Sequence, residues 1–201
     1  MTAQSRNHVP HGSWQRESHA AYMSIDQPLF CVPTVSGELV YILDPHADQI
    51  NLMDIAVGLS NTCRYAGQIQ QYYSVAQHSV VVSRMVGRRL APYGLLHDAA
   101  EAYLHDLGPA VKLMVGSLYR PIEDRLQELI YRSLGLRRLS ADDRMTLKDA
   151  DQRAAKAEME FFGICGRTGA GKAHHDADLV VPLGPGRARA LFLDRFNELF
   201  V

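Results

Sequence analysis

The chain has 201 residues, of which 47% are hydrophobic and 21% charged, a composition typical of one ordinary globular domain. Its 21 basic and 22 acidic side chains leave a formal net charge of −1, which argues against binding to a nucleic-acid polymer or an anionic membrane through overall charge. The sequence has three widely spaced cysteines with no CxxC pair, no signal peptide and no run long enough to span a membrane. We therefore predict a cytoplasmic protein.

The N-terminal part of the chain divides into an arm and a hairpin. Residues 1–28 are polar and show no periodicity, which predicts a flexible arm before a single domain over 29–201. The segment LFCVPTVSGELVYILDP then places two β-rich apolar runs around Ser36-Gly37-Glu38. This pattern predicts a short β-hairpin.

Beyond Pro45 the hydrophobic pattern is helical, with capping or breaking residues at the helix ends. Asn51 and Ser140 are suited to cap the helices that follow them, and Pro121 suits a first helical position. The expected helices are Leu52–Asn61, Val75–Leu90, Tyr93–His105, Pro121–Leu134, a long helix from Ser140 to about Phe162, and Gly186–Phe200. The sequence thus predicts an all-α bundle with a short N-terminal β-hairpin.

Several ionisable residues lie within apolar helical sequence. His97 and Asp98 are surrounded by leucines and alanines in LLHDAAEAYLHD, and His78 lies between Ala76 and Val80. Asp151 shares the apolar stripe of the long helix. Because burying an unpaired carboxylate costs several kcal/mol, each of these groups needs a partner.

A divalent cation would satisfy these four residues together. Imidazole and carboxylate ligands suit manganese, cobalt, zinc, iron or nickel. Taken singly, a buried histidine is more often bonded to the backbone, and an aspartate more often caps a helix or forms a salt bridge. The set of four favours the metal site, provided that the three helices converge.

Other charged residues lie where a metal site would use them. Glu101 follows Asp98 by three residues and is expected to project from the same helix face, as a general acid or base. Asp106 is equally compatible with a turn residue and a ligand contact. Arg64, Lys112 and Lys148 are either solvated surface charges or parts of a phosphate clamp.

With these residues assembled, the chain resembles the HD-domain metal-dependent phosphohydrolases, whose motif is a histidine, a His-Asp pair and a distant aspartate. The blocks DIAVGLSNTCRYAG, YSVAQHS, LLHDAAEAYLHDLGPAVK and LKDAD are similar to the 5′-deoxynucleotidase branch, which includes phage and prophage members and a phage dATP triphosphohydrolase. The likeness extends from about Ser36 to Phe200.

The resemblance implies a role for each matched residue. The metal ligands would be His78, His97, Asp98 and Asp151, and Glu101 would be the catalytic acid or base. Phosphate would contact Arg64, Lys112 and Lys148, Asp106 would lie near the sugar hydroxyl, and Tyr65 would line the sugar or base pocket. Some relatives carry tryptophan after the arginine, whereas this chain has Arg64-Tyr65-Ala66-Gly67. That difference predicts a roomier pocket.

The activity implied is attack of a metal-bound water on the phosphorus of a deoxynucleoside 5′-monophosphate, which releases phosphate. The cofactor would be one divalent transition metal. The alternative enzyme is a deoxynucleoside triphosphate triphosphohydrolase that releases tripolyphosphate, with additional Mg²⁺. An alternative from another class is a metal-stabilised module that senses a nucleotide without turning it over. The resemblance and the amphipathic last helix both favour a homodimer or a larger homo-oligomer.

Overall fold

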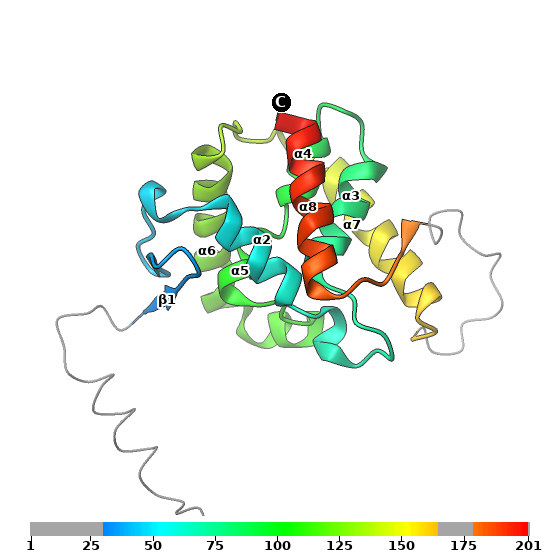
Figure 1. Ribbon diagram of the computed structural model, residues 1–201. Coiled ribbons are helices and arrows are strands. Elements are labelled where there is room, and N and C mark those ends of the chain that lie inside the picture. The colour runs from blue at the N-terminus through cyan, green and yellow to red at the C-terminus, as the bar shows by residue number, and fades with distance from the viewer. Residues whose placement is uncertain (1–29, 165–178, 201) are drawn as a thin grey trace, which may run out of the picture.

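The computed structural model describes residues 30–164 and 179–200, so the predicted N-terminal arm lies outside the described residues. The described chain is mostly helical and carries one short two-stranded antiparallel sheet. Figure 1 shows this hairpin at one edge of the helical body. The predicted combination of an all-α body and an N-terminal hairpin is confirmed.

The hairpin pairs β1 (Cys31–Pro33) with β2 (Leu39–Tyr41), and Val32 lies opposite Val40. Its turn is fixed to the first helix, because the backbone N–H and hydroxyl of Ser36 donate to the two carboxylate oxygens of Asp54, at 2.9 and 2.6 Å. Val40 is fully buried in the main core. The hairpin is therefore part of the packed domain.

The helices follow in chain order. They are α2 (Leu52–Asn61), α3 (Val75–Met85), α4 (Ala91–Leu96), α5 (Glu101–Leu104), α6 (Pro109–Ser133), α7 (Ala141–Phe161) and α8 (Pro185–Phe200), with short 3₁₀ turns η1 (Ala47–Gln49) and η2 (Arg64–Gly67). The predicted bounds of α2, α7 and α8 are confirmed to within a residue or two. Asn51 caps α2 through Met53 N–H, and Ser140 caps α7 through Asp143 N–H.

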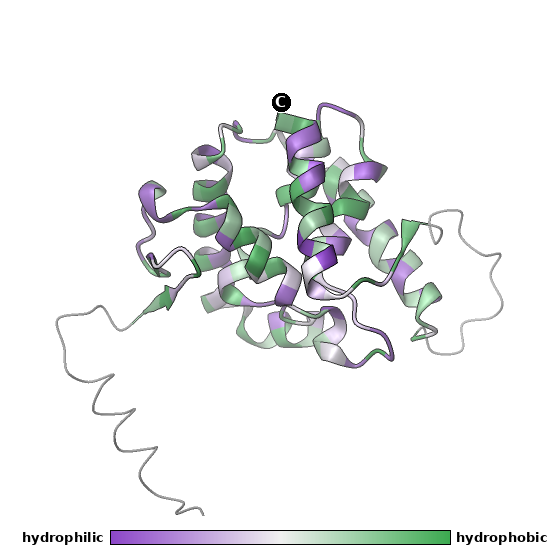
Figure 2. Cartoon of the chain, viewed as in Figure 1, coloured by the Kyte–Doolittle hydropathy of each residue, from purple (hydrophilic) through white to green (hydrophobic). Residues whose placement is uncertain are grey.

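The main core lies where α2, α3, α4 and α8 pack together. Ile55, Leu95 and Phe192 are fully buried there, and hydrophobic residues run along much of α2 (Figure 2). A second cluster joins Val82 of α3 to Leu147 and Ala154 of α7. No helix in the described ranges is long and apolar enough to cross a membrane.

Two predicted helices have different ends in the structure. The helix predicted over Val75–Leu90 ends at Met85, where Val86 adopts extended backbone angles. The helix expected to begin at Pro121 begins instead at Pro109 and contains Pro121 in its interior. The first half of α6 was not predicted, because its apolar residues do not form a buried helix face. Leu113, Met114 and Leu118 are all more than three-quarters exposed.

The single helix predicted over Tyr93–His105 is wrong, because Gln127 of α6 divides it into α4 and α5. An unbroken α-helix would join Ala100 N–H to the carbonyl of Leu96. Instead, Ala100 N–H donates to Gln127 Oε1 at 3.0 Å, and Gln127 Nε2 donates to Leu96 O at 2.6 Å. A side chain inserted into the helical hydrogen-bond ladder breaks the helix. His97 and Asp98 therefore lie in a tight turn between α4 and α5.

Candidate metal centre

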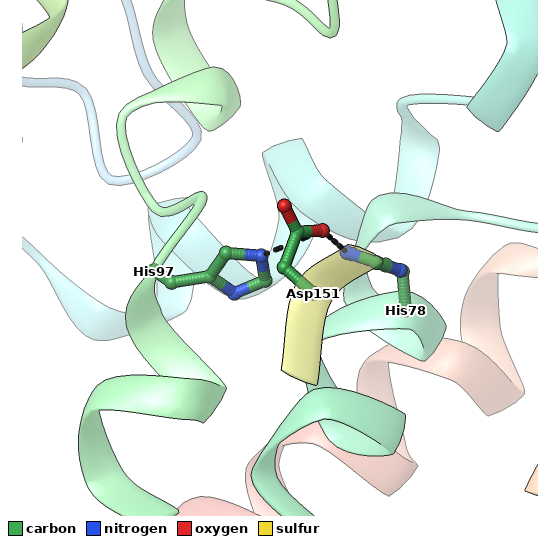
Figure 3. A group of neighbouring side chains, drawn as sticks. All are labelled: His78, His97 and Asp151. Carbon is green, nitrogen blue, oxygen red and sulfur yellow. Dashed lines mark hydrogen bonds and ion pairs between the residues drawn. The ribbon is translucent and has the colours of Figure 1, made fainter. Parts of the chain in front are cut away.

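Four ionisable side chains from three separate segments converge in the structure. His78 comes from α3, His97 and Asp98 from the turn after α4, and Asp151 from α7. Asp151 Oδ1 lies between the two imidazoles, 3.0 Å from Nε2 of His78 and 3.7 Å from Nε2 of His97 (Figure 3). Asp98 Oδ2 lies 3.1 Å from Nε2 of His97 and 3.7 Å from Nε2 of His78. We call these four residues the His/Asp cluster.

Local sequence explains why α3 and α4 can bring the two histidines together. α3 begins at a capping box in which Ser74 and Gln77 satisfy each other's backbone N–H groups. α4 approaches α3 closely at Gly94, where a Cβ atom would lie only 2.9 Å from the Cα of Ser83. Glycine at this position permits the approach, and the imidazole ring centroids of His78 and His97 are 5.2 Å apart.

Nδ1 of each imidazole lies within hydrogen-bonding distance of an acceptor oxygen. Nδ1 of His78 lies 2.7 Å from Oε1 of Glu158, and Nδ1 of His97 lies 3.0 Å from the carbonyl oxygen of Gly94. Partners of this kind fix metal-ligating histidines, because they hold the proton on Nδ1 and leave the lone pair of Nε2 free. Nε2 of His97 is buried and makes no hydrogen bond. The donor set therefore fits a divalent metal ion bound between the two Nε2 atoms and the aspartates.

The electrostatics of the cluster also favour a bound cation. Burial lowers the pKa of both imidazoles, but the surrounding carboxylates outweigh it and raise the pKa of His78 and His97 above its ordinary value. Burial raises the pKa of Asp98 and Asp151, yet the imidazoles lower it below its ordinary value. The cluster thus attracts positive charge, either as protons or as a metal ion that replaces them.

Glu101, at the start of α5, is a buried acid beside the cluster. Its Oε1 accepts a hydrogen bond from Lys112 Nζ at 2.9 Å, whereas its buried Oε2 has no partner. Burial and the carboxylates of Asp98 and Asp106 raise the pKa of Glu101 to about 9, against the opposing effect of Lys112. This raised pKa makes the carboxyl group of Glu101 a candidate proton donor.

Two cavities border the cluster. The smaller, of about 180 Å³, is lined by His97, Asp98, Glu101 and Lys112 among others. The larger, of about 720 Å³, includes His97, Asp151 and Lys148 in its wall. Lys112 donates to both Glu101 and Glu123 at 2.9 Å. The structure thus places two of the predicted phosphate contacts, Lys112 and Lys148, in the walls of cavities that reach the cluster.

The remaining predicted residues form a separate hydrogen-bonded group around Glu158. Arg64 Nη1 donates to Asp106 Oδ2 at 3.2 Å, and Arg64 Nη2 donates to Glu158 Oε2 at 3.3 Å. The Tyr65 hydroxyl donates to Glu158 Oε2 at 3.0 Å. Tyr65 and Ala66 have φ angles of 57° and 52°, so this loop has the left-handed backbone that non-glycine residues seldom adopt. The group joins Arg64, Tyr65 and Asp106 to the cluster through Glu158 and His78.

Glu158 is the functional residue that sequence analysis missed. It is fully buried, and although burial raises its pKa, His78 and Arg64 lower that pKa below the ordinary value, so Glu158 remains ionised. The signal was its position seven residues after Asp151 and four after Ala154, on the same face of α7. The alanines that precede it, Ala154 and Ala157, indicate only the apolar face of α7.

Comparison with known proteins places the chain among relatives with no stated activity. No protein-family model matches it. It is 34% identical to the uncharacterized protein YfdR of Escherichia coli over 172 residues, which cover 84% of this chain and 94% of YfdR. It is 32% identical to the uncharacterized protein RCAP_rcc00048 of Rhodobacter capsulatus over 182 residues, which cover 82% of this chain and 93% of that protein. The chain belongs to the family that contains YfdR.

Proposed function

We propose that this protein is an HD-domain phosphohydrolase that uses a divalent transition metal to remove phosphate from deoxynucleoside 5′-monophosphates. The observation that carries the proposal is the convergence of two imidazole Nε2 atoms with Asp98 and Asp151, next to the buried carboxyl group of Glu101. His78, His97, Asp98 and Asp151 would hold manganese, cobalt, zinc, iron or nickel. Such an ion supplies a Lewis acid, which polarises a phosphoryl oxygen and lowers the pKa of water.

Side chains of the protein would stabilise the charge of the phosphoryl group and protonate the leaving group. Lys112, 2.9 Å from Glu101, brings a positive charge to the smaller cavity, where it would stabilise the non-bridging oxygens of the phosphoryl group. Glu101 would donate a proton to the 5′ oxygen as the P–O5′ bond breaks, so that the nucleoside leaves as a neutral alcohol. Water would supply the OH group that the phosphate gains, and the remaining proton of that water would replace the one that Glu101 gives up.

The larger cavity supports a second candidate reaction. Its wall carries arginines in addition to Lys148, which would suit the longer anion of a deoxynucleoside triphosphate. In that reaction the same P–O5′ bond would break, and the products would be nucleoside and tripolyphosphate. The two reactions require the same metal ligands and the same proton donor.

Product analysis tests the proposal. Metal-stripped protein is supplied with Mn²⁺ or Co²⁺ and incubated with separate panels of deoxynucleoside monophosphates and triphosphates, and the products are separated by chromatography. Nucleoside and phosphate from the monophosphates are expected, whereas nucleoside and tripolyphosphate from the triphosphates would establish the second reaction. Turnover of neither panel by metal-loaded protein would contradict the proposal.

Ligand variants supply the control. Asp98→Ala and Asp151→Ala are each expected to bind metal poorly and to be inactive, since each removes a carboxylate from the His/Asp cluster. Metal content is measured by mass spectrometry alongside turnover. Wild-type turnover in either variant would exclude the assigned site.

A further inference from the structure

The first half of α6 carries its apolar side chains on the outside of the molecule. Nothing among the described residues covers Leu113, Met114 and Leu118, which are more than three-quarters exposed, and Val111 and Val115 are more than a third exposed. Four of these residues follow one another at spacings of three, one and three and form one stripe, which Leu113 flanks. We call these five residues the α6 outer face. Apolar residues at this spacing are typical of a helix that packs against another helix.

The opposite side of the same helical segment faces the protein and is mostly polar. The residues on that side, at spacings of four, three and four, are Lys112, Gly116, Tyr119 and Glu123. Lys112 Nζ donates to the carboxylates of Glu101 and Glu123, and the Tyr119 hydroxyl donates to the carbonyl oxygen of His105. A helix at the surface of a monomer normally has the reverse arrangement, with its apolar side inward. The α6 outer face therefore lacks a partner in a single copy of the chain.

The α6 outer face is large enough for a stable protein interface. Its five side chains expose on the order of 400–600 Å² of apolar surface. Two such faces packed together would therefore bury about 800–1,200 Å², and stable interfaces bury about 1,200–2,000 Å² in total. The exposed residues Ala110 and Ser117 lie beside the stripe and would add to this area.

The charges of this segment favour a second protein copy over a lipid surface. Lys112 is the one charged residue between positions 109 and 119, and its ammonium group is bound to two carboxylates on the inner side. A helix that lies on a membrane carries several lysines or arginines beside its apolar side. Two copies of the α6 outer face would instead meet without any like charges between them.

The last helix, whose amphipathic sequence is the other candidate for self-association, packs within the chain. α8 contacts α2, α3 and α4, and Phe192 on its apolar side is fully buried in the main core. Its apolar side is therefore occupied. Among the helices that the structure describes, α6 has the largest exposed apolar side chains grouped on one face.

We propose that the α6 outer face binds the same face of a second copy of this chain about a twofold axis. A twofold contact uses one patch twice, which suits a stripe of uncharged Leu, Met and Val side chains. The inner side of the same helix carries Lys112 and Glu123, which line the smaller cavity beside Glu101. Pairing would thus hold in place a helix that forms one wall of the candidate site. The contact does not depend on which reaction the site performs.

Sedimentation velocity of the full chain over a range of concentrations tests the contact. Wild type is expected to form an assembly of two copies or a multiple of two. Met114→Glu/Leu118→Glu should raise the dissociation constant of the pair at least about 100-fold, because each copy would bury two carboxylates. The control is Val35→Glu/Met145→Glu, which adds the same charge at two residues that are each 71% exposed, on the hairpin turn and on α7. It should assemble like wild type.

Two outcomes of sedimentation would overturn the proposal. One is a wild-type monomer at about 100 μM, a concentration that detects even weak pairing. The other is a Met114→Glu/Leu118→Glu variant that assembles as wild type does. Circular dichroism spectra and thermal unfolding of all three proteins show that a lost assembly is not a lost fold.

Amide hydrogen exchange over residues 109–119 shows what covers the face. In wild type these amides should exchange at least about tenfold more slowly above the dissociation constant than below it. In Met114→Glu/Leu118→Glu the exchange should not depend on concentration. Slow exchange at every concentration would overturn the proposal, because a segment of the same chain would then cover the face. Slowing of a monomer's exchange by phosphatidylcholine vesicles would assign the face to a membrane. Neither measurement requires metal or turnover, so each is independent of the proposed function.

Discussion

Each histidine of the His/Asp cluster has an acceptor oxygen close to its Nδ1 atom. For His97 the acceptor is a backbone carbonyl, which substitution cannot remove, but for His78 it is the carboxylate of Glu158. Glu158 also binds Arg64 and Tyr65. One buried side chain therefore contacts a proposed metal ligand and also holds the loop predicted to contact the substrate.

Glu158→Ala should weaken metal binding by about 10–100-fold, the usual effect of losing the partner of a ligating histidine. Glu158→Gln should restore much of the affinity, because its amide oxygen still accepts from Nδ1 of His78. Metal dissociation constants and ¹⁵N NMR of the His78 ring measure the two effects together. Glu160→Ala, on the same helix, is the matched control, and an equal loss of affinity there would refute a specific role for Glu158.

Glu101→Gln should retain the metal and lose turnover by about 10²–10⁴-fold, the range for a general acid or base. Glutamine still accepts from Lys112 but carries no acidic proton. Glu123→Gln removes the other carboxylate bound to Lys112 and should lose far less. If the two variants lose activity equally, the role of Glu101 is to hold Lys112 and not to donate a proton.

The ionisable residues of the cluster could be predicted from sequence because their neighbours are apolar, although only His78 is fully buried and the side chain of Asp151 is 39% exposed. His78, Asp98 and Asp151 lie in apolar helical sequence, where an unpartnered charge is too costly to retain. Glu158 could not be assigned in this way. Its partners Arg64 and Tyr65 are more than 90 residues away in sequence, and only the fold brings them together.

At the scale of the helices, the break between α4 and α5 puts His97 and Asp98 in a turn, close to His78 and Asp151. The side chain of Gln127 accepts from Ala100 N–H and donates to Leu96 C=O, the two groups that a continuous helix would join by a hydrogen bond. Helical periodicity predicts a continuous helix through these residues, and nothing local contradicts it. The break depends on a side chain from α6, so sequence analysis had no signal for it.

Gln127→Met should weaken metal binding, because methionine has similar length but can neither accept from Ala100 N–H nor donate to Leu96 C=O. Leu96 C=O, which also accepts from Ala99 N–H, can then accept from Ala100 N–H and extend α4. The turn that carries His97 and Asp98 would then change shape. Amide hydrogen exchange at Ala100 and metal affinity measure the two consequences. Unchanged metal affinity, with exchange at Ala100 altered, would show that the break does not position the ligands.

Gly94→Ala should destabilise the fold where α3 and α4 meet, since the new methyl group would lie within 3 Å of the Ser83 backbone. Overpacking of this kind costs about 1–3 kcal/mol. Thermal unfolding measures the effect. Gly87→Ala is the control, because a Cβ there has nothing within 4 Å, and a similar fall in Tm for both variants would argue against a close contact at Gly94.

For the whole molecule, the candidate metal site joins three segments that are far apart in sequence, so metal binding there should stabilise the folded state. Metal at about 100 times its Kd contributes about 2.7 kcal/mol, which for a chain of this size corresponds to a rise in Tm of about 5–10 °C. Calorimetric scans with and without Mn²⁺ measure the shift. Asp151→Ala should show almost none, and a full shift in that variant would place the metal elsewhere.

Helix α7 fixes the distances within the candidate site in a way that restricts changes of chain length. Arg144, Asp151 and Glu158 are spaced seven residues apart along it. Inserting or deleting one residue between them would rotate every following side chain by about 100° and shift it by about 1.5 Å. Proteins that share this site can therefore vary in length in the connection between α6 and α7, but hardly between residues 144 and 158.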